Sequence, residues 1–251
     1  MECVRYRPAS GGANNDAMNI SMQPAASRRF HTLMALVMAA IVVVGFSRSF
    51  YLRAWFDVAP LTLRLHLHAA VLTLWVVLFF VQARLIAVGR RRLHRSLGIA
   101  GVALAALAIA TTCAAAIESV RLGIERGGIG IDRLYSSVLL LILFGSFVGL
   151  GTAFRKRPDV HKAFMLLAMI AVIGPALTRA VALMLGSGIR DPHLPVESAL
   201  VLSGLIYHWR TRRRLQYVFL GGGLLLIATQ ATRRLVGGSE MWAQIGSWLV
   251  Q

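Results

Sequence analysis

Acidic residues are scarce in this chain, where ten Asp and Glu stand against 27 Lys and Arg and the formal net charge is +17. Nearly all ten lie in predicted loops and tails, which argues against a carboxylate proton relay or a pore for hydrated cations. The basic residues form short arginine clusters between apolar runs, without the aromatic-rich basic face that holds nucleic-acid bases. We therefore expect no nucleic-acid binding, and such clusters are typical of turns that meet anionic lipid headgroups.

Cysteine and the familiar catalytic motifs are also nearly absent. Cys3 lies in a polar N-terminal stretch, Cys113 lies in an apolar run, and no CxxC pair or Cys/His zinc pattern is present. The sequence contains no HExxH, GxSxG or Walker motif, and no GxGxxG after a strand. These absences exclude a disulfide framework and leave no signature of the common hydrolase, nucleotide-binding or dinucleotide-binding classes.

Apolar residues, in contrast, are abundant. Hydrophobic residues make up 57% of the 251 residues, charged residues only 15%, and the mean hydropathy is +0.67. A soluble domain has about a quarter charged residues, so this composition predicts a membrane protein. The clearest span is 69–88, which is almost continuously apolar. Its length is about the 20 residues that a helix needs to cross ~30 Å of hydrocarbon.

We predict an all-α polytopic transmembrane helix bundle of about seven spans. Spans six and seven are short, so that six crossings remain an alternative. A polar stretch without periodicity, 1–27, is expected to be a disordered tail. The bundle itself is expected to occupy 28–236, with spans at 30–50, 63–87, 96–118, 135–154, 163–186, 195–207 and 215–231.

The last segment, 237–251, is expected to lie in the membrane interface rather than to cross the bilayer. At helical spacing its apolar side chains fall roughly on one side, as in an amphipathic interfacial helix. These side chains are Trp242, Ile245, Trp248 and Leu249.

The distribution of basic residues predicts the orientation of the bundle. Three turns, 90–95, 155–162 and 209–214, hold four Lys or Arg each, twelve in all, whereas the alternate loops hold five. With the basic turns in the cytoplasm, the N-terminus is cytoplasmic. The bias towards Arg over Lys fits a high-GC genome, and we interpret the chain as a multi-pass protein of a bacterial inner membrane.

Two histidines are expected at one depth near the cytoplasmic ends of their spans. His94 precedes Arg95, and His161 precedes Lys162. A haem between helices needs two axial imidazoles at one depth, with basic residues near its propionates. The pattern therefore suggests a haem b site, for which the alternative is amphipathic histidines at headgroup level.

A second group of polar residues is expected near the outer end of the bundle. His68, Trp75 and Gln82 are seven residues apart and therefore share one face of a helix. An arginine within a span is by default a functional residue with a partner, although it can also extend to the headgroups. Glu118 is the only carboxylate that we expect there. The predicted ligand cavity comprises His66, His68, Trp75, Gln82, Glu118 and Arg179.

The phrases APLTLRLHLHAAVLTLWVVLFFVQARLIAVGRRRLHRSLGIAG, RKRPDVHKAFMLLA and GPALTR, with a C-terminal GGG…W…WLV, resemble a family of uncharacterised bacterial multi-span membrane proteins. The resemblance covers about residues 40–250. It implies the membrane location and a set of site residues, but no reaction. The family's later basic turn reads Tyr-Asp and then His-Pro, where this chain has Tyr207-His208 and Gln216-Tyr217. The matching residues are His68, Trp75, Gln82, His94, Arg95, Gly98, His161, Lys162 and Met165.

Three hypotheses for function follow from these patterns. The first is a haem-binding or redox-linked membrane protein. The second is a transporter or small-molecule-binding protein with a polar cavity inside the membrane. The third is a structural partner in a membrane assembly.

Overall fold

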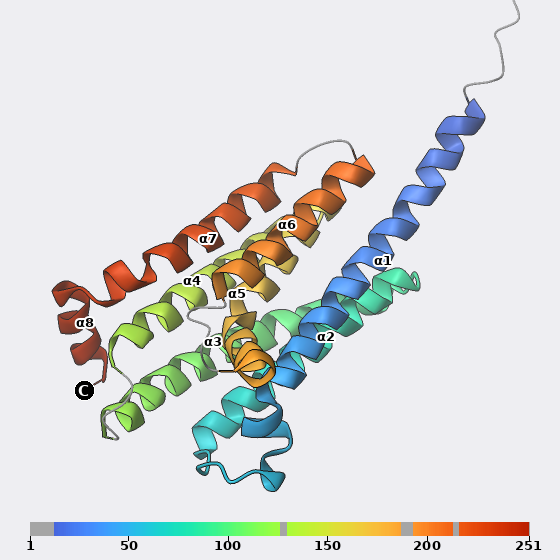
Figure 1. Cartoon of the computed structure of the whole chain (residues 1–251). Coiled ribbons are helices and arrows are strands. Elements are labelled where there is room, and N and C mark those ends of the chain that lie inside the picture. The colour runs from blue at the N-terminus through green and yellow to red at the C-terminus, as the bar shows by residue number, and fades with distance from the viewer. Residues whose placement is uncertain (1–12, 126–129, 187–192, 213–215, 251) are drawn as a thin grey trace, which may run out of the picture.

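The computed structural model describes residues 13–125, 130–186, 193–212 and 216–250. Within these ranges the chain forms helices and short connections and no strand. The prediction of an all-α helix bundle is confirmed, with seven long helices and a short eighth helix across one end (Figure 1). The helices are α1 Ala13–Phe46, α2 Leu63–Ala87, α3 Arg91–Glu125, α4 Asp132–Ala153, α5 Pro158–Leu185, α6 His193–Arg212, α7 Tyr217–Gly237 and α8 Glu240–Val250. Between α1 and α2 lie a π-helical turn, η1 Ser47–Tyr51, and a 3-10 turn, η2 Arg53–Trp55.

Most of the long helices have the length and composition of membrane spans. Large apolar side chains remain exposed on the outside of the bundle, for example Leu74 at 57% and Ile99 at 77%. Such a surface is far too apolar for water and is suited to lipid. The protein is therefore a membrane protein. Five described segments could cross a bilayer, namely Ser27–Tyr51, Leu63–Ala87, Arg91–Gly123, Arg133–Ala153 and Pro158–Leu185, and α7 adds a shorter apolar segment, Tyr217–Gln230.

The second helix has the limits that the sequence predicts because both of its ends carry stop signals. At its start the Thr62 hydroxyl accepts a hydrogen bond from the backbone N–H of Leu65 at 3.4 Å, as an N-cap residue does. At its end Gly89 takes a left-handed φ of 80°. This conformation lets the N–H of Arg90 reach the carbonyl of Leu85 at 2.8 Å, the pattern of a glycine-terminated helix.

The basic turns α2–α3 and α4–α5 lie at the same end of the bundle, which we call the arginine end. Contacts between distant segments hold this end together. Phe30 of α1 stacks on Tyr207 of α6 with ring centroids 4.0 Å apart. The side-chain amide of Gln216, just before α7, donates to the carbonyl of Asp159 in α5 at 2.8 Å. The middle of α1 and the starts of α5 and α7 therefore meet the end of α6 here.

Helix α5 is the most buried element and forms the centre of the bundle. Twelve of its residues are buried, among them Leu167 and Ile170, which are fully enclosed. Helix α1 crosses it closely, because Gly45 lies directly against the backbone of Ala176. Small residues at a crossing let two helices approach closely, which is the usual way to gain packing energy in a membrane.

The N-terminal segment differs from the expected irregular tail. The structure continues α1 back to Ala13, so that residues 13–27 are helical and residues 1–12 lie outside the described part. In Figure 1 the start of α1 projects beyond the bundle. Adding residues to an existing helix costs much less than nucleating one, so a span can extend into a polar stretch.

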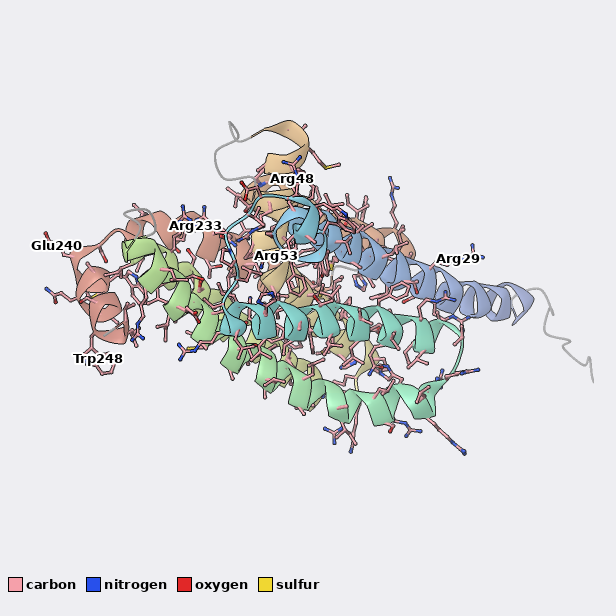
Figure 2. All side chains as sticks on the ribbon, turned by 90° about the horizontal axis from the view of Figure 1, so that it is seen from below. Arg29, Arg48, Arg53, Arg233, Glu240 and Trp248 are labelled. Carbon is pink, nitrogen blue, oxygen red and sulfur yellow. The ribbon has the colours of Figure 1, made fainter. Side chains whose placement is uncertain are left out.

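The C-terminal segment forms α8 at the opposite end from the arginine end. Trp242 is 8% exposed and donates its indole N–H to the carbonyl of Ile131 at 2.9 Å. Trp248 is 73% exposed and projects away from the bundle, as Figure 2 shows. The four apolar side chains that we expected on one side therefore point in two directions. Trp242 and Leu249 pack on the end of α3 and the start of α4, while Ile245 and Trp248 point outward.

We predict that Gly45→Ala destabilises the bundle. The added methyl group would overlap the backbone of Ala176, and backbone cannot move aside as a flexible side chain can. The expected loss is about 1–3 kcal/mol, measured as a lower melting temperature of the detergent-solubilised protein. Gly149→Ala is the matched control, because nothing lies within 4 Å of an added Cβ at that position of α4. Equal melting temperatures for both variants would contradict the close crossing of α1 and α5.

Candidate functional sites

Two histidines from different helices meet near the arginine end. His94 lies in the first turn of α3 and His161 in the first turn of α5. Their ring centroids are 6.2 Å apart and their planes are nearly perpendicular, at 84°. We call them the histidine pair. The structure therefore brings together the two imidazoles that the sequence placed at one depth.

Local structure fixes the position of His161 and its tautomer. Pro158 begins α5 at the first helical position, where its missing N–H is not needed. One turn later, Nδ1 of His161 lies 2.8 Å from the carbonyl oxygen of Gly151 in α4. A carbonyl only accepts hydrogen bonds, so Nδ1 carries the proton and donates. The neutral ring then has its lone pair on Nε2, the form that binds metals and accepts protons.

The surroundings of His94 leave one of its nitrogen atoms without a partner. Its Nδ1 atom is buried and makes no hydrogen bond. The backbone of Gln82, in the last two turns of α2, lies beside the ring. The side-chain oxygen of Gln82 is also buried and without a partner. Unsatisfied buried polar atoms are uncommon in folded proteins and often mark functional positions.

The two cations next to the histidine pair differ in their surroundings. Arg95 is exposed, whereas Lys162 is half-buried and lies within electrostatic reach of His31 in α1. In the described part of the chain, no group of three or more His, Cys, Asp and Glu side chains could hold a metal ion. Neither His94 nor His161 lines the pocket between α1, α2 and α5 or the groove at the end of α2.

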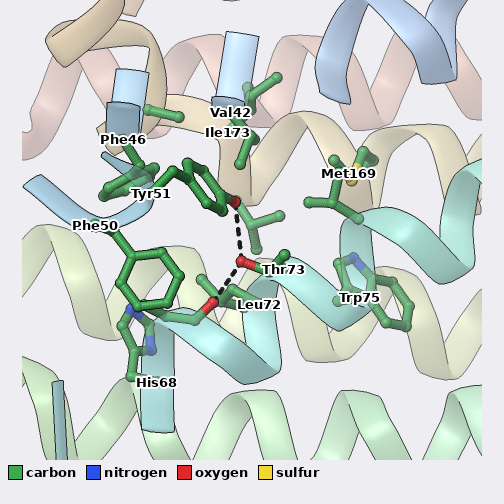
Figure 3. A pocket seen from close by; sticks show the side chains of 14 residues that line it. Val42, Phe46, Phe50, Tyr51, His68, Leu72, Thr73, Trp75, Met169 and Ile173 are labelled. Carbon is green, nitrogen blue, oxygen red and sulfur yellow. Dashed lines mark hydrogen bonds between the residues drawn. The ribbon is translucent and has the colours of Figure 1, made fainter. Parts of the chain in front are cut away.

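A separate pocket of about 50 Å³ lies towards the opposite end, between α1, η1, α2 and α5 (Figure 3). Most of its lining is apolar. The hydroxyl groups of Tyr51 and Thr73 are 2.9 Å apart, and Thr73 also donates to the carbonyl of Ala69 at 2.7 Å. Since Thr73 has only one hydroxyl proton, Tyr51 is the donor of the first bond.

His68 and Trp75 line this pocket from one face of α2. Nδ1 of His68 lies 3.3 Å from the hydroxyl of Thr112 in α3, and that hydroxyl donates to the carbonyl of Ala108 at 2.6 Å. Nδ1 of His68 is therefore the donor, and its Nε2 keeps the lone pair. The indole N–H of Trp75 is buried without a partner, and the ring packs edge-on against Phe144 at 5.1 Å.

The other four residues of the predicted ligand cavity lie outside this pocket. Gln82 is beside the histidine pair. His66 has its Nδ1 atom 3.0 Å from the carbonyl of Thr62. Glu118 is 3.9 Å from exposed Arg64. The predicted single cavity is thus distributed over the two ends of the bundle. His68 and Gln82 share a face of α2, but at 1.5 Å per residue they lie about 21 Å apart along the helix.

Arg179 contacts the back of the pocket rather than its interior. Its guanidinium group lies 4.8 Å from the centre of the Phe46 ring and donates to the carbonyl of Pro175 at 3.0 Å. Phe46 lines the pocket, and Arg179 does not. A cation over an aromatic face is stabilised by the ring's quadrupole. Arg179 therefore fixes one wall of the pocket.

The sequence analysis missed the most deeply buried carboxylate. Glu197 of α6 is 1% exposed and accepts hydrogen bonds from the amide nitrogen of Gln230 in α7, at 3.0 and 3.3 Å. Arg233, one turn further along α7, is within electrostatic reach. The available signal was a carboxylate inside predicted span six with a polar residue inside predicted span seven. Glu118, the carboxylate that we expected at the outer end of the third span, lies in the last turns of α3 with a side-chain exposure of 14%.

The fold and these two sites define the class of the protein as an integral membrane helix bundle with a histidine pair and a small internal pocket. Comparisons with models of known protein families, with curated proteins and with solved structures found no match. The functional argument therefore depends on the geometry of this chain.

We predict that Gln230→Ala destabilises the packing of α6 against α7. The change removes both hydrogen bonds to the buried Glu197 carboxyl group, and an unsatisfied buried acceptor costs about 1–3 kcal/mol. Thermal unfolding in detergent measures the effect. Gln244→Ala on the exposed side of α8 is the control and is expected to leave the melting temperature unchanged. If the two variants unfold at the same temperature, Gln230 does not support Glu197.

Proposed function

We propose that the protein is a redox-linked protein of a bacterial inner membrane that binds one haem b through His94 and His161. The observation that carries this proposal is the meeting of two imidazoles from separate helices at the arginine end, 6.2 Å apart. The basic turns at that end favour a cytoplasmic location of the pair.

The number of ligands favours haem over a free metal ion. Structural metal ions in proteins generally take about four ligands from side chains. The histidine pair offers two, and no third His, Cys, Asp or Glu joins it in the described ranges. A porphyrin supplies four nitrogen ligands itself and needs only two axial ligands from the protein.

The side chains around the histidine pair fit this role. The bond from Nδ1 of His161 to Gly151 orients the ring and leaves its Nε2 atom as the ligand atom. The buried Nδ1 atom of His94 has no hydrogen-bond partner, and a bound group could provide one. Arg95 is exposed beside the pair, where a cation can meet propionate groups. Because neither described pocket reaches the rings, a porphyrin would displace side chains that now pack around them.

Haem in such a site supplies one-electron transfer, and the protein tunes it through the axial ligands and their hydrogen bonds. This chain's own contribution would be to hold the two imidazoles side by side, with the His161 ring oriented by its bond to Gly151. The Gly151 carbonyl keeps the proton of His161 on Nδ1, so that the lone pair of Nε2 is available for a ligand bond.

We predict a Soret band in the protein purified from cells supplied with a haem precursor. His94→Ala and His161→Ala should each lose most of the bound haem, because a single remaining imidazole cannot provide both axial ligands. The visible spectrum per mole of purified protein measures this. His66→Ala is the control, since His66 lies at the far end of α2 and contacts neither histidine. Absence of the band in the unaltered protein, or its equal loss in the control, would contradict the proposal.

A second candidate function is the binding or transport of a small polar molecule in the pocket of His68 and Trp75. The observation that favours it is the buried indole N–H of Trp75, which lines the pocket and has no partner. Arg179 lies behind the Phe46 wall and the lining is mostly apolar. The charge of Arg179 reaches His68 of the lining, but the Phe46 ring stands between the guanidinium group and the pocket. An anion would find no direct ion-pair partner there, so the pocket favours a neutral hydrogen-bond acceptor.

This candidate predicts that acetamide raises the melting temperature of the detergent-solubilised protein more than acetate does. Trp75→Phe should abolish the difference, because it removes the unpaired indole donor of the pocket while keeping an aromatic ring. Trp248→Phe, at the exposed face of α8, is the control. If acetamide and acetate act alike, or Trp75→Phe responds as the unaltered protein does, the pocket does not select a neutral acceptor.

A further inference from the structure

An open groove runs along the end of α2 at the arginine end. Its volume is about 450 Å³. Four apolar side chains form its walls, and two arginines border it. The lining residues are Phe80, Val81, Arg84, Leu85, Val88 and Arg90.

Among the described residues, no carboxylate pairs with either arginine. Arg84 and Arg90 are exposed, and neither makes an ion pair in the described part of the chain. The ion pair that is present joins Arg64 and Glu118, at the other end of α2. Two guanidinium groups beside one apolar groove attract an anion that also carries apolar chains.

The backbone turn places both arginines on the same groove. Arg84 lies in the last turn of α2, and Arg90 follows the left-handed Gly89. The hydrogen bond from the N–H of Arg90 to the carbonyl of Leu85 folds the chain back over the helix end. Six residues apart in sequence, the two cations therefore border the same depression.

The groove lies at the depth of lipid headgroups. At 1.5 Å per residue, α2 is about 37 Å long, which exceeds the ~30 Å of hydrocarbon in a bilayer. Its last turns therefore reach the headgroup region, whereas Phe80 and Val81, one turn deeper, remain beside the acyl chains. A molecule that fits this groove has an anionic head at the level of the arginines and apolar tails one turn deeper in the membrane.

We propose that this groove binds an anionic phospholipid of the cytoplasmic leaflet. The lipid phosphate lies between Arg84 and Arg90, because guanidinium groups bind phosphate oxygens in a bidentate manner. An acyl chain lies against Phe80, Val81 and Leu85. A zwitterionic lipid is selected less strongly, since its own ammonium group already balances the phosphate. This inference does not depend on haem binding.

The test measures lipid retention by the purified full-length protein in detergent. Native mass spectrometry with equal amounts of phosphatidylglycerol and phosphatidylcholine of the same acyl chains gives the ratio of the two bound lipids. We expect a preference of about tenfold for phosphatidylglycerol, from two cations near the headgroup. The double variant Arg84→Gln/Arg90→Gln should reduce it to about twofold or less.

The control removes the same charge from the same turn. Arg91→Gln/Arg92→Gln alters two exposed arginines that do not line the groove, and it should keep the preference. Equal loss in the control would show that diffuse positive charge, and not the groove, selects the lipid. Equal binding of phosphatidylcholine would show that only the apolar walls act. Competition by millimolar inorganic phosphate would show a site for a free anion, and each of these three results overturns the proposal.

Discussion

The constraint on which this structure depends is that hydrocarbon offers no hydrogen bonds. Backbone groups must therefore bond within each helix, and polar side chains inside the bundle must find partners on the protein. Thr112 shows the consequence, because its hydroxyl donates to its own helix and accepts from His68 of the neighbouring helix. Glu197 and Gln230 show the same pairing between α6 and α7. Among the described buried atoms without partners, those on Trp75, Gln82 and His94 lie at the two candidate sites and indicate where the bundle has capacity for another molecule.

Helix α5 connects the two candidate sites. Its first turn carries His161, and its middle lines the pocket with Met169 and Ile173. Along its length it packs against α1, α4, α6 and α7. Pro175 and Ala176 follow at the point where α1 crosses at Gly45. The helix that holds the fold together thus also sets the depth of the histidine pair and the width of the pocket. A change in the packing of α5 would therefore alter both the histidine pair and the pocket.

The sequence predicted the membrane fold and the limits of α2, because bilayer length, the Thr62 cap and Gly89 are all local signals. It also placed His94 and His161 at one depth, since depth follows from the order of spans and turns. Contacts between side chains of different helices could not be predicted from the sequence. Which helix faces Trp75, and that Arg179 lies over Phe46, depends on the rotation and crossing of helices far apart in sequence. Glu197 was missed for the same reason, as its partner is 33 residues away.

The most direct test of the account is the side of the membrane on which the arginine turns lie, because the shared depth of the histidine pair follows from it. In a chain with Cys3→Ser and Cys113→Ser, the single changes Arg92→Cys, Lys156→Cys and Ala54→Cys can be labelled with a membrane-impermeant maleimide in inverted vesicles. We predict labelling of Arg92→Cys and Lys156→Cys, in the α2–α3 and α4–α5 turns, and protection of Ala54→Cys, between α1 and α2. Labelling of only one of the two turns would place His94 and His161 on opposite sides and contradict the account.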